Sequence, residues 1–262
     1  MKRIRGYVVS LIAVACLVGS VLPACATNDQ TIFIRGVLAP SANRQGGSCV
    51  YNGDATQALL FQPLMDVGLT NSYSAVLLVG NQLIPRGDPQ NNRAESNRVR
   101  INGGIVKVSN PDGSPILKAD GSPVPDFTSL ATGFADPQNN NAPAYTPIGL
   151  VVVDAPTKDA LLPSVATKGT ARTILVTVKA FGTSLGGEDV ESGDFQFPMQ
   201  ICRGCLVIQD GYDPARDPKD ANCLKAPESS AGATTGPCFR GQDLPISCRD
   251  CQGLDVCDPK KP

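Results

Sequence analysis

The sequence predicts an all-β fold: an immunoglobulin-like antiparallel β-sandwich followed by a disulfide-rich, mostly irregular C-terminal tail. Closure of the strands into a barrel is the alternative to a sandwich. Three observations lead to this prediction. Short runs rich in β-branched residues recur between turn residues from position 27 to position 201. No amphipathic stretch of helical period there is longer than about two turns. Seven of the ten cysteines lie after position 201, in a segment with few apolar residues.

Six segments have the residue types of β-strands. In residues 172–181 apolar side chains alternate with polar ones, as in a sheet with one solvated face. Residues 73–79 are apolar on both faces, so we expect them to form a central strand. The six predicted strands are residues 31–38, 73–79, 97–108, 148–153, 172–181 and 194–201.

The third predicted strand changes phase at the glycine pair 103–104. Val99 and Ile101 occupy odd-numbered positions before the pair. Val106 and Val108 occupy even-numbered positions after it. A β-bulge at the glycines would keep both apolar pairs on the core face, and we therefore predict one there.

Two connections between the predicted strands are long and polar. Residues 86–95 form one, and residues 110–147 form the other. The second is too long for a plain connection, so we expect a functional, self-packed or mobile loop. Within it, the near-repeated segments 112–116 and 120–124 each contain an Asp-Gly turn signal, which predicts a small exposed hairpin.

The N-terminal segment has the plan of a secretory signal. A basic start is followed by an apolar run over residues 7–22 and a small-residue exit. The tetrad Leu22-Pro23-Ala24-Cys25 resembles a bacterial lipobox, which implies removal of residues 1–24 and acylation of Cys25. Ordinary cleavage after Ala26, giving a secreted or periplasmic protein, is the alternative.

The predicted mature protein has two parts and a cell-envelope address. Residues 25–201 would form the sandwich and residues 202–262 the cysteine-rich tail. Ala26 after Cys25 looks like the arrangement that bacterial lipoproteins of the outer membrane carry. The expected partners are the membrane, through the N-terminal lipid, and a protein or glycan of the envelope. With 23 basic and 24 acidic residues, the chain lacks the positive charge that nucleic-acid binding requires.

The cysteine count predicts a disulfide framework. Eight cysteines remain when Cys16 and Cys25 of the signal region are set aside, and an even count is typical of exported proteins held by disulfides. Because seven of the eight lie in the tail, complete pairing requires one of them to bond with Cys49. The sequence does not choose among the connectivities. The eight are Cys49, Cys202, Cys205, Cys223, Cys238, Cys248, Cys251 and Cys257.

Two Cys-x-x-Cys pairs, at 202–205 and 248–251, also suggest zinc binding or redox chemistry. Zinc-ribbon pairs are usually about 15–20 residues apart, whereas 42 residues lie between these two. A redox dithiol needs a helix N-terminus at its first cysteine, but a strand-like segment follows Cys205. Structural disulfides are therefore the preferred interpretation, and we expect neither a metal nor a cofactor.

The composition argues against the common catalytic mechanisms. With no histidine, the chain cannot hold a Ser-His-Asp triad or a Cys-His pair. We therefore predict a binding or structural module without catalytic residues. The alternative is a secreted hydrolase that uses carboxylates, since such a pair is assembled only in three dimensions. The acidic cluster in residues 188–194 is more typical of a solvated turn.

Two segments, 88–92 and 136–140, share the sequence Asp-Pro-Gln-Asn-Asn. Loops at one end of an immunoglobulin-like scaffold often recognise ligands, which makes these segments candidate recognition loops. Turn formation is the competing interpretation, because turns use the same residue types. Four aspartates in residues 210–220 have a spacing that fits no calcium loop. The candidate recognition residues are Asp88, Asn91, Asn92, Asp136, Asn139 and Asn140.

The overall layout resembles that of uncharacterised cell-envelope lipoproteins of the myxobacterial type. The resemblance lies in residues 73–83, 95–101 and 195–206, and in Gly241-Gln242-Asp243 before Cys248. It implies a cell-envelope location and a disulfide-linked tail. It brings no known activity.

Overall fold

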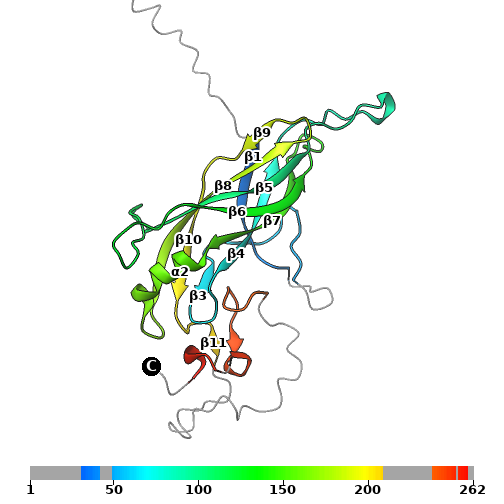
Figure 1. The fold of residues 1–262 in the computed structure, drawn as a ribbon. Helices are drawn as coiled ribbons and strands as arrows, with labels where there is room; N and C mark the ends of the chain where they lie inside the picture. Colours follow the sequence, from blue (N-terminus) through cyan, green and yellow to red (C-terminus); the bar gives the residue numbers. More distant parts are fainter. Residues whose placement is uncertain (1–30, 42–48, 209–237, 252, 259–262) are drawn as a thin grey trace, which may run out of the picture.

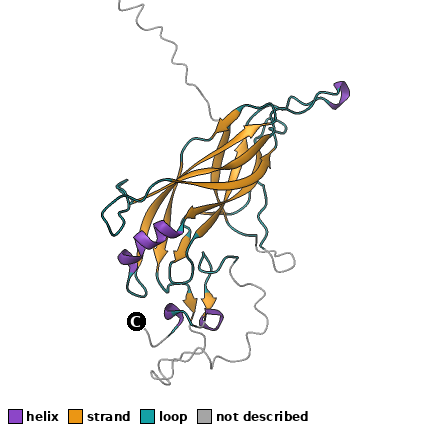
Figure 2. Cartoon of the chain, viewed as in Figure 1, coloured by secondary structure: helices purple, strands orange, loops and turns teal. Residues whose placement is uncertain are grey.

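The computed structural model describes residues 31–41, 49–208, 238–251 and 253–258. Strands are the main regular elements of this part of the chain, and its single α-helix, α2 (Ala155–Leu161), is short (Figure 2). The prediction of a mostly β protein is confirmed. Among the described residues, no helix has both the length and the apolar character needed to cross a membrane.

The first principal sheet has four strands in the order β2-β1-β4-β7. All its neighbouring strands are antiparallel. The run predicted to be central, β4, lies between β1 and β7, and its residues from Leu77 to Asn81 are all buried. The four strands are β1 (Ile32–Leu38), β2 (Leu59–Leu60), β4 (Tyr73–Asn81) and β7 (Ala144–Val153).

The second principal sheet follows the order β3-β10-β8-β5-β6, with the short β9 paired to β8. Its pairs are antiparallel except for β3 with β10. These strands are β3 (Leu64–Asp66), β5 (Val99–Ser109), β6 (Phe127–Ala135), β8 (Ala171–Ser184), β9 (Asp189–Glu191) and β10 (Phe195–Cys202).

Both sheets contribute side chains to one hydrophobic core. From β8, the alternating residues Ile174, Val176 and Val178 are fully buried, as the period of two predicts. From the first sheet, Leu77 and Ile148 lie in the same core. The two curled sheets therefore face one another across a shared apolar layer (Figure 1).

The predicted bulge in β5 is confirmed. The pairing of β5 shifts between Ile101 and Gly103 on both of its neighbours, β6 and β8. Val99 and Ile101 before the shift and Val106 after it are all fully buried. The extra residue therefore restores the inward direction of the apolar side chains.

The prediction of one long connection over residues 110–147 is wrong, because β6 occupies residues 127–135. The inward positions of β6 include Ser129, Ala131 and Gly133, while its outward positions include Leu130 and Phe134. This pattern of apolar residues outside and small ones inside hid the strand from an analysis of hydrophobic periodicity. Small inward residues fit here because Ile148 of β7 packs directly against Gly133.

The near-repeat in residues 110–124 forms two Asp-Gly turns. In the first, the Asp112 carboxylate accepts hydrogen bonds from Ser114, and in the second Asp120 accepts from Ser122 in the same way. A bridge between Leu117 and Pro123 closes the predicted hairpin. The segment is not wholly exposed, because Ile116 is buried in the core.

The two sheets also meet along one edge, where β6 and β7 lie side by side. The Val151 amide of β7 donates a hydrogen bond to the Ser129 hydroxyl of β6 at 2.9 Å. This bond joins the edge strand of one sheet to the edge strand of the other. The body is therefore partly closed on this side.

The described part of the tail forms a small unit below the body (Figure 1). Strand β11 (Val207–Ile208) pairs in parallel with β12 (Ile246–Ser247). Short 3-10 helices follow at η5 (Cys248–Cys251) and η6 (Asp255–Cys257), and two others, η1 (Pro89–Asn91) and η2 (Leu162–Val165), lie in the body. A second hydrophobic cluster joins the tail to Leu69 of the body.

Candidate functional site

The two Asp-Pro-Gln-Asn-Asn segments lie at the same end of the body. The Gln138 amide donates to the Leu83 carbonyl at 2.8 Å, which links the connection after β6 to the connection after β4. The Asp136 carboxylate forms an ion pair with Arg98 at 2.7 Å. The structure thus joins the bases of the two loops, whereas η1, with Asp88 and Asn91, lies at the tip of a hairpin that projects from the body (Figure 2).

Their polar groups are largely used within their own loops. Asp88 caps η1 by accepting from the Gln90 and Asn91 amides and from the Asn91 side chain, and that side chain lowers the pKa of Asp88. Asn92 and Asn140 adopt left-handed backbone conformations that asparagine tolerates well, and Asn139 forms a bridge with Ala142. This geometry agrees with turn formation and shows no side chains converging on a ligand.

Asn81, at the end of β4, organises this end of the body. It is fully buried, and its amide group donates to the Asn97 carbonyl at 2.9 Å and to the Ala135 carbonyl at 3.0 Å. Its side-chain oxygen accepts from the Leu83 amide. One side chain therefore fixes three chain segments, which the sequence analysis did not anticipate.

The predicted disulfide cysteines lie mainly at the opposite end. Cys49 is bonded to Cys238, Cys202 to Cys205, and Cys251 to Cys257, and Cys248 is also disulfide-bonded. The bond from Cys49 to Cys238 joins the body to the tail across 189 positions of sequence. The predicted lipidation residue Cys25, the predicted disulfide residue Cys223 and the aspartates of residues 210–220 lie outside the described residues.

Asp66 holds the Cys202–Cys205 turn in place. Its buried carboxylate accepts hydrogen bonds from the backbone amides of Gly204 at 2.8 Å, Leu206 at 3.0 Å and Gly68 at 3.0 Å. The carboxylate and the two cysteine sulfurs are close enough to bind one metal ion together. However, the sulfurs are bonded to each other, and the carboxylate already accepts hydrogen bonds from three backbone amides. The arrangement therefore has a structural role, and we call it the Asp66 clamp.

The tail pairs with the free edge of β3 through an isolated bridge between Met65 and Gln242. The Asp66 amide donates to the Gly241 carbonyl, and the Asp243 amide donates to the Leu64 carbonyl, both at 2.9 Å. Gly241 has a φ of 76°, and a Cβ there would crowd Leu69. The position therefore requires glycine, and the edge of β3 is covered by the tail.

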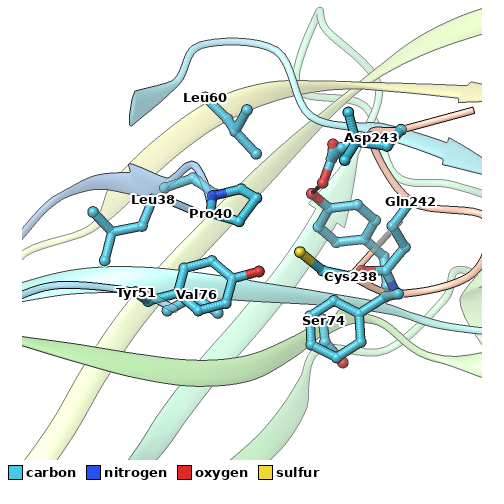
Figure 3. A pocket seen from close by; sticks show the side chains of 13 residues that line it. Leu38, Pro40, Tyr51, Leu60, Ser74, Val76, Cys238, Gln242 and Asp243 are labelled. Atoms are coloured by element: carbon cyan, nitrogen blue, oxygen red, sulfur yellow. Dashed lines mark hydrogen bonds between the residues drawn. The ribbon is translucent and has the colours of Figure 1, made fainter. Parts of the chain in front are cut away.

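Tyr73 of β4 and Asp243 of the tail are joined by a hydrogen bond, drawn as a dashed line at Asp243 in Figure 3. The buried Tyr73 hydroxyl donates to the Asp243 carboxylate at 2.6 Å, and the Leu64 amide donates to the other carboxylate oxygen at 2.9 Å. Burial raises the pKa of Tyr73, and the neighbouring carboxylate raises it further. Burial also raises the pKa of Asp243, against the opposite effect of its two hydrogen bonds.

A small cavity lies beside this pair (Figure 3), between β1, β4 and the tail. Its volume of about 20 Å³ is enough for one water molecule. Gln242, which is 5% exposed, lines the cavity with a side-chain oxygen that has no hydrogen-bond partner, while its amide group donates to the Ser72 carbonyl. The cavity is too small for an organic substrate.

A larger groove of about 340 Å³ lies between the body and the end of the tail. One side includes Lys158 of α2 and Arg203, which directly follows β10. The other side includes Asp255 and the apolar residues Leu254 and Val256 near the end of the tail. This volume falls within the range of small-ligand sites, and the mixture of apolar and charged groups is typical of them. Of the two hollows described above, only this groove has the volume of a small-ligand site.

The acidic cluster of residues 188–194 lies at the turn around β9. Glu191 forms an ion pair with Lys179 across the sheet, and Asp189 accepts from the Thr183 hydroxyl. Glu188, Asp189 and Glu191 are exposed. These carboxylates are solvated and do not face each other across a cleft in the described part of the chain.

Comparisons with known proteins add no family to this description. No protein-family model matches the chain, and no curated protein matches it. The resemblance to myxobacterial lipoproteins therefore stays a prediction.

Proposed function

We propose that the protein is an exported binding module of the cell envelope, held at the outer membrane by a lipid on Cys25. Its two sheets would be arranged as an immunoglobulin-like sandwich, and the cysteine-rich tail would form part of the binding surface. The expected partner is a protein or glycan of the envelope. No catalytic step is part of the proposal.

The observation that supports binding is the fixed attachment of the tail beside the 340 Å³ groove. A disulfide, the Asp66 clamp and the Tyr73–Asp243 bond all act at the end of the body that borders the groove. A surface that is held rigidly loses less conformational entropy on binding. Disulfides are also typical of exported proteins, which agrees with a signal segment.

The hydrolase alternative receives no support from the described carboxylates. Asp66 is taken up by three backbone amides, and Asp243 by Tyr73 and Leu64. Neither is free to protonate a leaving group or to activate water.

The test is the intact mass of the full chain expressed in a Gram-negative host, with free thiols blocked before and after reduction. We expect a mature chain that starts at Cys25 and carries acyl groups, with eight thiols appearing only on reduction. A chain that starts at Thr27 without lipid would contradict the anchor. Thiols that react before reduction would contradict the structural role of the cysteines.

A binding test follows from the groove. Arg203→Glu reverses one charge at its rim, and Lys107→Glu makes the same change on an exposed strand position elsewhere. In cross-linking to envelope material, the first variant is expected to lose its adducts and the second to keep them. Equal adducts from both variants would place the binding surface outside the groove.

A further inference from the structure

We propose that the end of the body where β1 begins rests on the membrane surface, with an apolar rim of five side chains in the lipid headgroup region. The rim consists of Phe33, Ile84, Phe134, Tyr145 and Leu185. This inference rests on the proposed function, because it takes the lipid on Cys25 as its starting point. It assigns the membrane to one end of the molecule and the partner to the other.

The length of the tether limits how far the body can lie from the membrane. Six positions separate Cys25 from Thr31, the first described residue. A fully extended chain of that length spans at most about 21 Å. Strand β5 alone, with 11 residues, is about 36 Å long. The body therefore cannot stand on the membrane with its far end down, because the start of β1 would then lie farther from the lipid than the tether can reach.

Hydrogen bonds place the loops of this end around the start of β1. The Gln82 amide donates to the Thr31 carbonyl, where the tether enters the body. The Asn97 side chain donates to the Ile84 carbonyl, and the Leu185 amide donates to the Arg98 carbonyl. Ile84 and Leu185 thus lie on either side of the same segment, residues 96–98.

The other three rim residues lie at the ends of strands on the same side. Phe33 and Tyr145 are the second residues of β1 and β7, and Phe134 is the next-to-last residue of β6. The Phe33 and Tyr145 rings meet edge to face at 5.9 Å, and the Arg98 guanidinium lies over the Phe134 ring at 4.7 Å. Aromatic rings with polar neighbours are typical of side chains at a membrane interface.

Three of the rim side chains are large, apolar and exposed to water. Ile84 is 66% exposed, Leu185 55% and Phe134 45%. Phe33 and Tyr145 are half-buried. Exposed apolar side chains at one end of a molecule can form an interaction surface, and here the tether determines which surface is within reach.

The charges of the two loops, residues 82–98 and 136–143, balance, and the turn that holds Leu185 adds the exposed carboxylates of Glu188 and Asp189. Apolar contact rather than attraction to anionic lipid would therefore hold this end at the membrane. Asp136 is paired with Arg98, and Glu95 accepts from three backbone amides, which lower its pKa against the opposite effect of burial. The charged residues are Arg86, Arg93 and Arg98 against Asp88, Glu95 and Asp136.

The experiment uses the absence of tryptophan from the chain. Leu185→Trp introduces one fluorophore into the rim of the full-length lipidated protein. Leu117→Trp is the matched control, since Leu117 is 54% exposed and lies in the hairpin after β5, at the other end of that strand. Both proteins are placed in phosphatidylcholine vesicles, with and without bromine on the acyl chains. Ile84→Trp replaces the rim variant if that protein does not fold.

We expect bromine to reduce the Leu185→Trp emission roughly twofold, because an interfacial side chain lies within about 10 Å of the acyl boundary. The Leu117→Trp emission should be unchanged. If the protein floats with the vesicles but bromine quenches neither position, or both equally, the orientation is wrong and the anchor stands. If the protein does not float with the vesicles at all, the anchor and the orientation are both wrong.

Discussion

A single hydrogen bond between Tyr73 and Asp243 links the body to the tail. The Tyr73 ring is part of the hydrophobic core, while its hydroxyl reaches the tail carboxylate. A phenol suits this position because its apolar ring can be buried and its one polar group can be satisfied at the boundary.

We predict that Tyr73→Phe lowers the free energy of unfolding by about 1–3 kcal/mol, because the half-buried Asp243 carboxylate loses a donor. The apolar ring, and hence the packing of the core, is retained. Urea unfolding of the oxidised protein measures the loss. Tyr145→Phe is the control, since the Tyr145 hydroxyl only accepts an exposed hydrogen bond from Arg35. Equal losses in both variants would contradict a special role for the Tyr73 hydroxyl.

The raised pKa of Asp243 predicts a dependence of stability on pH. Because the folded protein holds this proton more tightly than the unfolded chain, Asp243 contributes stability in acid that is lost as the pH rises through its folded pKa. Asp243→Asn cannot lose a proton. The stability of the native protein relative to this variant should therefore fall between acidic and neutral buffer, as measured by urea unfolding at each pH. A constant difference would contradict the shift.

At the scale of elements, the contact between β6 and β7 is the point where the two sheets join. The Ser129 hydroxyl satisfies the Val151 amide, which belongs to the edge strand of the other sheet. Since Ser129 is buried, water cannot easily replace it as an acceptor.

We predict that Ser129→Ala lowers the free energy of unfolding by about 1–3 kcal/mol, since it leaves that amide unpaired. Thr132→Ala, on the exposed face of the same strand, should cost less than about 1 kcal/mol. Denaturant unfolding of both variants measures the difference. Faster hydrogen exchange at Val151 in the Ser129→Ala protein would locate the effect.

Strands whose inward residues are large and apolar were predicted from the sequence, and a strand whose inward residues are small was not. Strand β8 alternates regularly because one of its faces is in the core, and β5 revealed its bulge through a change of phase. Strand β6 was missed because its inward residues are small and Leu130 points to solvent at 80% exposure. Its inward positions are filled instead by Ile148 from the facing sheet, and a linear pattern contains no signal of that contact.

The same limit applied to the candidate site. Proline, asparagine and aspartate at residues 88–92 and 136–140 indicated turns that the structure contains. Asp66, Tyr73 and Asp243 were not predicted as site residues, because the partners that join body and tail lie 138 to 179 positions away in the sequence. The odd number of tail cysteines was the one long-range signal in the sequence. It predicted that one tail cysteine bonds to Cys49, and in the structure that cysteine is Cys238.

At the scale of the whole molecule, the bond from Cys49 to Cys238 closes a loop of 189 positions. We predict that Cys49→Ser with Cys238→Ser lowers the free energy of unfolding by about 5 kcal/mol, because the unfolded chain regains the entropy of a long loop. Cys251→Ser with Cys257→Ser opens a loop of only 6 positions and should cost about 2 kcal/mol. Thermal and urea unfolding compare the two. A larger loss from the shorter loop would contradict this account.

The same bond also determines how the molecule would carry a mechanical load. A pull applied between the N-terminus and the C-terminus passes from Cys49 directly to Cys238, so the stretch between them bears no tension. Strand β1 lies outside this shortcut and would be the part of the body to yield, by peeling from β4. Reduction of the bond would release about 640 Å of additional chain under force. Under force between its two ends, the oxidised protein would thus extend only a little, whereas the reduced protein could extend over the full length of the released chain.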